Sequence, residues 1–430
     1  MGQTLTLTIS PTIAFARSQH INSKHRNQSV EDALKYFDEM CSGSKEGGEW
    51  CLRAKIDMSS VNGTMQDPVL YRQNTTPHHR SGTKYKAYPT YDLACPIVDS
   101  IEGVTHALRT LEYNDRDEQY AWLQHALKLR RVRIHAFSRM NFMYTELSKR
   151  KLTWFVENKK VTGWDDPRFP TVRGVVRRGI NIQALTEFIL EMGASRRINL
   201  MEWNKFWAKN KKEIDPLSKR FMAVSGRENC ARVKVVNAPA MSANAFITTE
   251  YFPKDATAGK RIVRIGTDVL VEKSDVEGIQ VGEDIVLMRW GLVKVTKVDG
   301  DSIEGEYVDT ESGSEQLKNA KRKLTWLADC EENVAVKLYE FDNLISKASL
   351  EEGEDYKDFI NENNKAVSEA IGDSGLKRLK ENDVIQLERR GFFRVDKAWA
   401  AGKGNEIELI TIPDGKSKAM STITGKLAHR

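Results

Sequence analysis

Two short runs, Val104-Thr105-His106-Ala107-Leu108-Arg109-Thr110 and Val132-Arg133-Ile134-His135-Ala136-Phe137, decide the fold class of this sequence. Each run follows a stretch with apolar residues at helical spacing, residues 91–101 before the first and residues 118–127 before the second. Helices that alternate with short strands are typical of a mostly parallel α/β sheet. We therefore predict an α/β region around residues 91–137.

A basic segment, Leu147-Ser148-Lys149-Arg150-Lys151-Leu152, follows this region. A serine hydroxyl beside clustered cations suits phosphate oxygens, and the Lys149 ammonium is a compact point charge. Basic tetrapeptides are nevertheless common on solvated surfaces. The chain supplies its own example, because the hexapeptide Lys-Arg-Lys-Leu-Thr-Trp of residues 149–154 recurs at residues 321–326 in a β-rich region. The segment by itself leaves phosphate binding and plain surface both open.

The charge distribution favours a polyanionic partner. The 430-residue chain carries a mild formal charge of +6, and its 40% hydrophobic and 29% charged residues describe an ordinary globular protein. Its cations gather between residues 128 and 151, where eight Lys and Arg residues are opposed only by Glu146. Such a cluster marks either a surface that faces a polyanion or a solvated face.

The cysteine pattern disfavours a zinc site and a disulfide scaffold, since five scattered cysteines form no Cys-x-x-Cys pair, and it fits a reducing cytosol. His78, His79 and His106 have no metal-ligand spacing, so we expect no bound metal. No apolar run approaches the roughly 20 residues that cross a bilayer. Residues 1–20 contain one cation, Arg17, and no acid, whereas a transit peptide would be richer in Arg. We expect them to be an unstructured or foreign leader without an assigned role.

The spacing of apolar residues predicts further helices and a β-rich region in the rest of the chain. Residues 29–40 predict a helix capped by Ser29, and residues 152–158, 181–192 and 201–213 predict three more helices. Ile214-Asp215-Pro216 is a plausible domain boundary. Beyond it, short alternating runs at 261–265, 284–288, 292–298, 384–387 and 407–412 predict β-barrels, interrupted by a helical stretch at 355–380.

Two further motifs give the basic segment a context. Tyr88-Pro89-Thr90-Tyr91-Asp92 and Glu102-Gly103-Val104-Thr105-His106 precede it, and with them the chain resembles the class I glutamyl/glutaminyl-tRNA synthetases of the eukaryotic and archaeal type. The basic segment corresponds to the family's KMSKS signature in its Leu-Ser-Lys-Arg form. The resemblance implies a multidomain α/β plus all-β protein. Its expected parts are a partial Rossmann-type catalytic domain at 21–150, a helical connecting region at 151–215 that contacts the tRNA stem, and tandem anticodon-binding β-barrels at 216–430.

The resemblance also implies a site. Tyr91 falls on the tyrosine of the amino-acid pocket, although a core tyrosine is an equal alternative without the motif. The residue eighteen positions later is Arg109, where glutamyl enzymes have arginine and glutaminyl enzymes a small residue; the alternative is a surface arginine on an edge strand. The ATP-binding residues implied are Thr110, Arg139, Met140, Leu147, Ser148 and Lys149. Ser148 and Lys149 would be catalytic.

The implied activity is the ATP-dependent activation of glutamate, with Mg²⁺ in the ATP complex, and its transfer to tRNA(Glu) in the cytoplasm. Assembly with other synthetases or a tRNA-binding accessory protein stays open. One family motif is missing, because no His-x-Gly-His occurs in the sequence. We therefore expect a synthetase that begins partway through its catalytic domain, whose adenylation activity alone is in doubt. The alternatives are a non-catalytic tRNA-binding protein and, disfavoured by Arg109, a glutaminyl enzyme.

Overall fold

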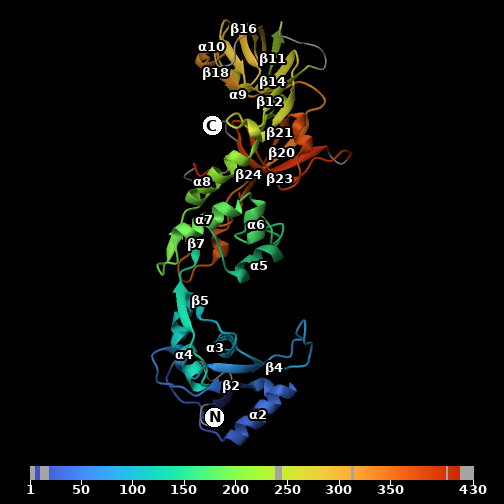
Figure 1. Cartoon of the computed structure of the whole chain (residues 1–430). Helices are drawn as coiled ribbons and strands as arrows, with labels where there is room; N and C mark the ends of the chain where they lie inside the picture. Colours follow the sequence, from blue (N-terminus) through green and yellow to red (C-terminus); the bar gives the residue numbers. More distant parts are fainter. Residues whose placement is uncertain (1–4, 10–18, 238–244, 311–313, 403–404, 417–430) are drawn as a thin grey trace. The chain divides into compact units, whose positions relative to one another are not determined.

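The computed structural model describes residues 5–9, 19–237, 245–310, 314–402 and 405–416. The chain forms two compact units (Figure 1). The first comprises residues 1–140 and 194–199, and the second comprises residues 141–193 and 200–430.

The first unit opens with a four-stranded antiparallel sheet in the order β1-β2-β3-β4. Its strands are β1 (Leu5–Ile9), β2 (Trp50–Ala54), β3 (Val69–Gln73) and β4 (Ala87–Pro89). Helix α2 (Val30–Ser42) packs Met40 against Trp50 and Leu52, and Ser29 caps it as predicted by accepting a hydrogen bond from the Asp32 amide at 3.0 Å. The expectation of an unstructured leader is wrong for residues 5–9, because they pair along β2.

The predicted alternation of helix and strand is confirmed in the rest of this unit. Its elements are α3 (Tyr91–Ile101), β5 (His106–Thr110), α4 (Asp117–Ala126) and β6 (Arg133–Phe137). Strands β5 and β6 are parallel, with His106 opposite Arg133 and Thr110 opposite Phe137. Leu93 of α3 and Leu123 of α4 share one core with Ala54 and Leu70 of the antiparallel sheet, so both helices are anchored to that sheet.

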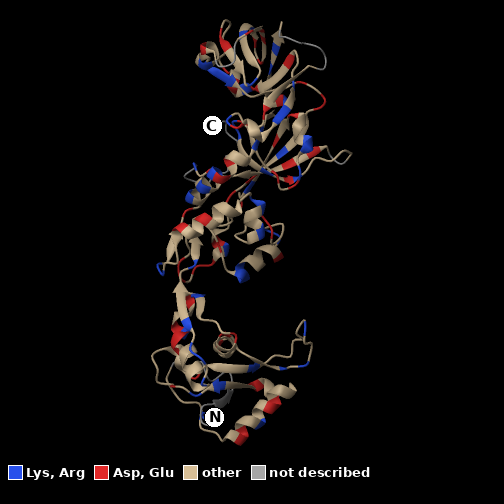
Figure 2. Cartoon of the chain, in the orientation of Figure 1, with Lys and Arg blue, Asp and Glu red and all other residues tan. Residues whose placement is uncertain are grey.

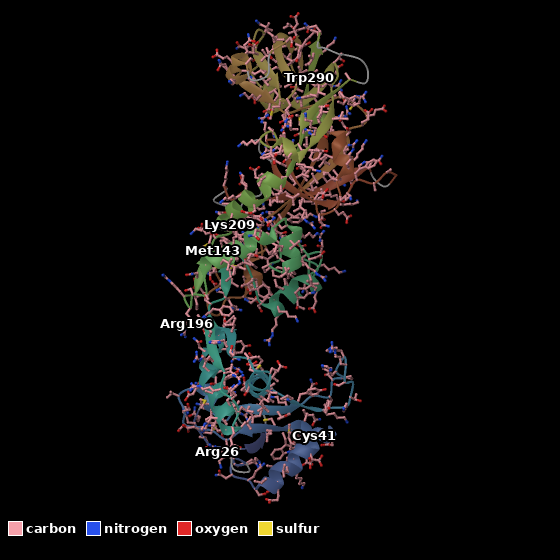
Figure 3. The ribbon with its side chains drawn as sticks, in the orientation of Figure 1. Arg26, Cys41, Met143, Arg196, Lys209 and Trp290 are labelled. Atoms are coloured by element: carbon pink, nitrogen blue, oxygen red, sulfur yellow. The ribbon has the colours of Figure 1, made fainter. Side chains whose placement is uncertain are left out.

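The second unit begins with a helical region whose helices are α5 (Lys149–Glu157), α6 (Val172–Arg177), α7 (Ile182–Met192) and α8 (Trp203–Ile214). The short strands β7 (Met140–Phe142) and β8 (Asn199–Met201) each have their first residue in the first unit and the rest in the second. Aromatic rings hold it together: Phe142 stacks on Trp203 with centroids 4.0 Å apart, and Phe188 meets Phe206 edge-on at 5.2 Å. Lys209 of α8, labelled in Figure 3, pairs with Glu191 of α7. Three helices were predicted here within a few residues of their bounds.

Two curled seven-stranded sheets make up the remainder, where the sequence predicted barrels (Figure 1). One has the order β10-β21-β20-β24-β23-β22-β9 and contains β9 (Lys219–Phe221), β10 (Ala223–Ser225), β20 (Val334–Phe341), β21 (Lys365–Gly372), β22 (Val384–Leu387), β23 (Gly391–Lys397) and β24 (Glu406–Ile412). The other has the order β18-β15-β16-β17-β11-β14-β19 and contains β11 (Cys230–Val236), β14 (Asp268–Glu272), β15 (Asp284–Leu287), β16 (Gly291–Asp299), β17 (Ser302–Val308), β18 (Arg322–Leu324) and β19 (Trp326–Ala328). A separate hairpin joins β12 (Phe246–Glu250) to β13 (Lys260–Arg264). Each large sheet buries its own apolar core. In the second, the rings of Trp290, labelled in Figure 3, and Trp326 lie 4.8 Å apart at a tilt of 39°.

The helix predicted at 355–380 is wrong. Residues Lys365–Gly372 form β21, flanked by two short 3₁₀ turns at Tyr356–Phe359 and Ser374–Arg378. All eight residues of β21 pair antiparallel with β20, and its end also pairs with β10. These ladders override the helix-forming Lys, Glu and Ala residues of the segment, because strand preference depends on packing and pairing more than on the local sequence.

Candidate amino-acid and phosphate sites

A small pocket in the first unit brings Tyr91 and Arg109 together. Tyr91 is the first residue of helix α3, and Arg109 is the penultimate residue of strand β5, which follows α3 in the chain. The start of the helix and the end of the strand therefore lie side by side at this pocket. The space between the lining side chains is about 10 Å³. The lining residues are Tyr91, Asp92, Cys95, Pro96, Arg109, Arg116, Gln119 and Tyr120.

Arg109 is a half-buried cation held by ring faces. Its guanidinium carbon lies 4.7 Å from the ring centre of Tyr120 and 5.8 Å from that of Tyr91. Among the described residues Arg109 forms no direct ion pair or hydrogen bond, although its charge partly offsets the rise that burial causes in the pKa of Asp117. Arg116 in the same pocket pairs directly with Asp92. The five N–H donors of Arg109 are therefore oriented and available to a carboxylate ligand.

Hydrogen bonding and burial set the state of the other tyrosine and thiol groups of the pocket. Tyr120 donates its hydroxyl to Asp99 at 2.7 Å, which fixes the ring under Arg109. Burial raises the pKa of the Cys95 thiol, so it is protonated near neutral pH and unsuited to covalent catalysis. Burial also raises the pKa of Tyr91, which stays a neutral hydroxyl.

Two of the residues predicted to bind ATP meet at one carboxylate. Thr110 ends β5, and its hydroxyl hydrogen-bonds to Glu112; this bond first, and the cation of Arg139 in addition, lower the pKa of Glu112. Arg139 forms an ion pair with Glu112 on the surface. Met140 follows as the first residue of β7. Thr110 and Arg139, 29 positions apart in the sequence, thus share a partner.

The predicted Ser-Lys loop lies in the second unit and is in part helical. Ser148 occupies the N-cap position of α5, and Lys149 is the first helical residue. Glu146 fixes the turn, because its Oε1 accepts from the amides of Leu147 at 3.1 Å and Ser148 at 3.0 Å, while Lys151 donates to its Oε2 at 2.7 Å. The helix anchors itself through Leu152 and Phe155 in a core completed by Val161, Phe169, Leu344, Ile345 and Tyr356.

The charge at this helix start is unusual. The first turn of α5 contains Lys149, Arg150 and Lys151 and no acid (Figure 2), although the positive end of a helix dipole favours acids there. Lys151 is neutralised by Glu146, but Lys149 and Arg150 are exposed, and the described residues give them no ion pair. A helix N-terminus with unpaired cations can bind phosphate oxygens through both its amides and its charges.

The second copy of the hexapeptide has a structural role. Within residues 321–326, residues 322–324 form β18 and residue 326 begins β19. Arg322 donates to Glu283 at 3.2 Å and to the carbonyl of Asp275 at 2.8 Å. Trp326 is completely buried and donates its indole N–H to the carbonyl of Met288. This copy lies in two short strands and does not begin a helix.

The sequence-predicted residues therefore form three groups. Tyr91 and Arg109 share the pocket, Thr110, Arg139 and Met140 follow β5 and β6 in the first unit, and Leu147, Ser148 and Lys149 lie in the second unit. Several lining residues were missed, among them Gln119 and Tyr120 of α4. These two belong to a helix that was predicted only as scaffold, and no local signal separates them from its other residues.

Comparisons with known proteins agree with the resemblance. The catalytic domain family of class I (E and Q) tRNA synthetases matches residues 12–216, and two anticodon-binding domain families of the same class match residues 218–312 and 323–396. Among the described residues, no helix is long and apolar enough to span a membrane.

Related full sequences are glutamate–tRNA ligases. The chain is 44% identical over 409 residues to the probable cytoplasmic glutamate–tRNA ligase of Schizosaccharomyces pombe and 45% identical over 402 residues to that of Saccharomyces cerevisiae. These alignments cover 94% and 93% of this chain but 56% of each relative, so the chain spans about half their length. A bifunctional glutamate/proline–tRNA ligase of Drosophila melanogaster is 46% identical over 418 residues, which are 94% of this chain and 24% of that protein. With three matching domain families and these identities, the chain belongs to the class I glutamyl/glutaminyl-tRNA synthetase family.

Proposed function

We propose that this chain belongs to a glutamate–tRNA ligase, which forms glutamyl-adenylate from glutamate and ATP·Mg²⁺ and transfers glutamate to tRNA(Glu). One observation carries the proposal: Arg109 is a half-buried cation that contacts two tyrosine rings and forms no direct ion pair among the described residues. Family membership supplies the reaction type, and the names of the relatives supply the amino acid.

Arg109 and Tyr91 would select glutamate. A guanidinium binds a carboxylate through two parallel hydrogen bonds, and these charge-assisted bonds are stronger than neutral ones. Glutamine offers a neutral amide, whose NH₂ group cannot accept from Arg109, so part of the cation would stay unpaired in a half-buried pocket. A site built for one polar group rejects an analogue that lacks it.

Ser148 and Lys149 would act on ATP, together with Thr110, Arg139, Met140 and Leu147. Negative charge increases on the phosphate oxygens as pyrophosphate leaves. A cation fixed at a helix start stabilises that charge more in the transition state than in the ground state. The unopposed positive charge of the first turn of α5 supports this role, because it destabilises the helix when no anion is bound.

The two large sheets would bind the anticodon arm of the tRNA, since anticodon-binding families match both. RNA sequence is read mainly in unpaired bases, and phosphate contacts make the binding fall with salt. We place the protein in the cytoplasm, as the relatives are named, and the fused relative makes other synthetases plausible partners.

A second candidate is a tRNA-binding protein that does not activate glutamate, favoured by the two anticodon-binding families that match residues 218–312 and 323–396. Two assays on the purified chain separate the candidates: tRNA binding and glutamate-dependent pyrophosphate exchange. Binding with exchange supports the ligase, binding without exchange supports the second candidate, and no tRNA binding contradicts both.

The hexapeptide copies provide a matched control for the phosphate site. Lys149→Ala should lower kcat for exchange more than it raises KM for glutamate, since an interaction made mainly in the transition state is lost. Lys321→Ala changes the counterpart of Lys149 in the second copy, directly before β18, and should leave exchange unchanged. Equal losses in both variants would mean that Lys149 belongs to a general basic surface.

A further inference from the structure

Gln119 has a buried side-chain amide without a hydrogen-bond partner among the described residues. Its side chain lines the pocket with Tyr91 and Arg109 and is 2% exposed. Neither Nε2 nor Oε1 has a hydrogen-bond partner among the described residues. Most buried polar side-chain atoms in proteins are paired, so this exception requires an explanation.

Gln124 shows that the same helix can satisfy a buried glutamine. It too is 2% exposed, and its Nε2 donates to the carbonyl of Pro96 at 3.2 Å while its Oε1 accepts from the amide of Val132 at 3.1 Å. Gln124 therefore joins α4 to α3 and to the start of β6. Gln119 forms no such link between elements. Its unpaired buried amide makes the folded chain less stable than an apolar side chain at the same position would.

The other polar groups of the pocket already have partners. Asp92 pairs with Arg116, and Asp99 accepts from Tyr120. The charge of Arg109 and the amide of Gln119 are left facing the same small space. Pro96 also lies on its wall, inside α3, and lacks the N–H that would bond the backbone carbonyl of Asp92. The space of about 10 Å³ is close to that of one water, which needs two to four polar partners.

We propose that Gln119 is a specificity-determining residue of the amino-acid pocket and acts on the same ligand carboxylate as Arg109. Arg109 engages the side-chain carboxylate of the amino acid directly, and Gln119 donates from Nε2 to it through a single water. Gln119 thereby supplies a donor where a carboxylate is bound, which an apolar residue at this position could not. The proposal rests on the proposed binding of glutamate.

The test is isothermal titration calorimetry of L-glutamate into the purified chain, with a thermal melt of each variant. Gln119→Met keeps the shape and removes the amide. It should weaken glutamate binding about 10-fold or more, since hydrogen bonds to charged groups are strong, while leaving the melting temperature unchanged or raised. Gln119→Glu places a like charge near the ligand and should weaken binding further.

Gln124→Met is the matched control. It breaks two hydrogen bonds and should lower the melting temperature, but leave the glutamate affinity of the folded protein unchanged. Wild-type affinity in Gln119→Met would overturn the inference and leave the proposed function standing. No glutamate binding by the wild-type chain would overturn both. A drop in melting temperature in Gln119→Met with unchanged affinity would make Gln119 a structural residue.

Discussion

Replacing Arg109 by leucine should remove most of the glutamate affinity without unfolding the protein. Truncating one partner of a buried charge pair costs 2–5 kcal/mol, and because Arg109 is half-buried we expect the lower part, about 2–3 kcal/mol. That is roughly a 30- to 150-fold rise in Kd for L-glutamate. Stability should fall by about 1–2 kcal/mol, since Arg109 loses two cation–π contacts of about 0.5–1 kcal/mol each.

Arg116→Leu is the control variant for Arg109→Leu. Arg116 lines the same pocket, but it is already paired with Asp92, and the two side chains are 41% and 17% exposed. Its loss should lower the free energy of unfolding by about 1 kcal/mol, as for a partly exposed pair, and weaken glutamate binding far less than Arg109→Leu. Calorimetry and urea unfolding on both variants measure the two effects. Full affinity in Arg109→Leu, with the loss appearing in Arg116→Leu, would refute the assignment of the carboxylate site.

Three further predictions concern the second unit. Gly179→Ala should lower the free energy of unfolding of this unit in urea by about 2–4 kcal/mol, because φ of Gly179 is +92° and the new Cβ would lie 2.3 Å from Cδ1 of Ile412. A decrease below about 1 kcal/mol would contradict this packing. Arg261→Met should cost about 3–5 kcal/mol, since it strands the carboxylate of Asp373, 2.6 Å away, in a buried site; wild-type stability would mean that water reaches the pair. Burial raises the pKa of Cys230 to about 12 from 9.0, so the thiol ionises first in the unfolded chain and stability should fall as pH rises between these values. The stability of Cys230→Ala should fall less steeply with pH, and an identical dependence of stability on pH in both proteins would contradict the shift.

The repeated hexapeptide shows why local sequence could not settle every element. The residues Lys-Arg-Lys-Leu-Thr-Trp start helix α5 at Lys149 but form strand β18 at Arg322. In the first copy Leu152 is buried against Phe155 and its neighbours, and in the second Leu324 is buried in a sheet core. Tertiary packing decides between the two, because intrinsic propensities differ by only a few tenths of a kcal/mol for these residues.

The pocket was partly predictable for a different reason. The alternation of α3, β5, α4 and β6 follows from the apolar pattern, and the parallel pair of strands then brings Tyr91 and Arg109 to one place. Gln119 was not predictable, because a polar residue on an amphipathic helix normally faces solvent. Gln124 is equally buried, so only the unpaired amide of Gln119, a property of the folded chain, distinguishes the two.

The most direct test of the account is the selectivity of the wild-type chain between L-glutamate and L-glutamine, measured by calorimetric titration at one pH and salt concentration. An unpaired Arg109 between two tyrosines predicts binding of L-glutamate and at least about 30-fold weaker binding of L-glutamine, because the amide leaves the cation unsatisfied. Equal affinity for the two amino acids, or a preference for L-glutamine, would contradict the central claim that this pocket is built for a carboxylate.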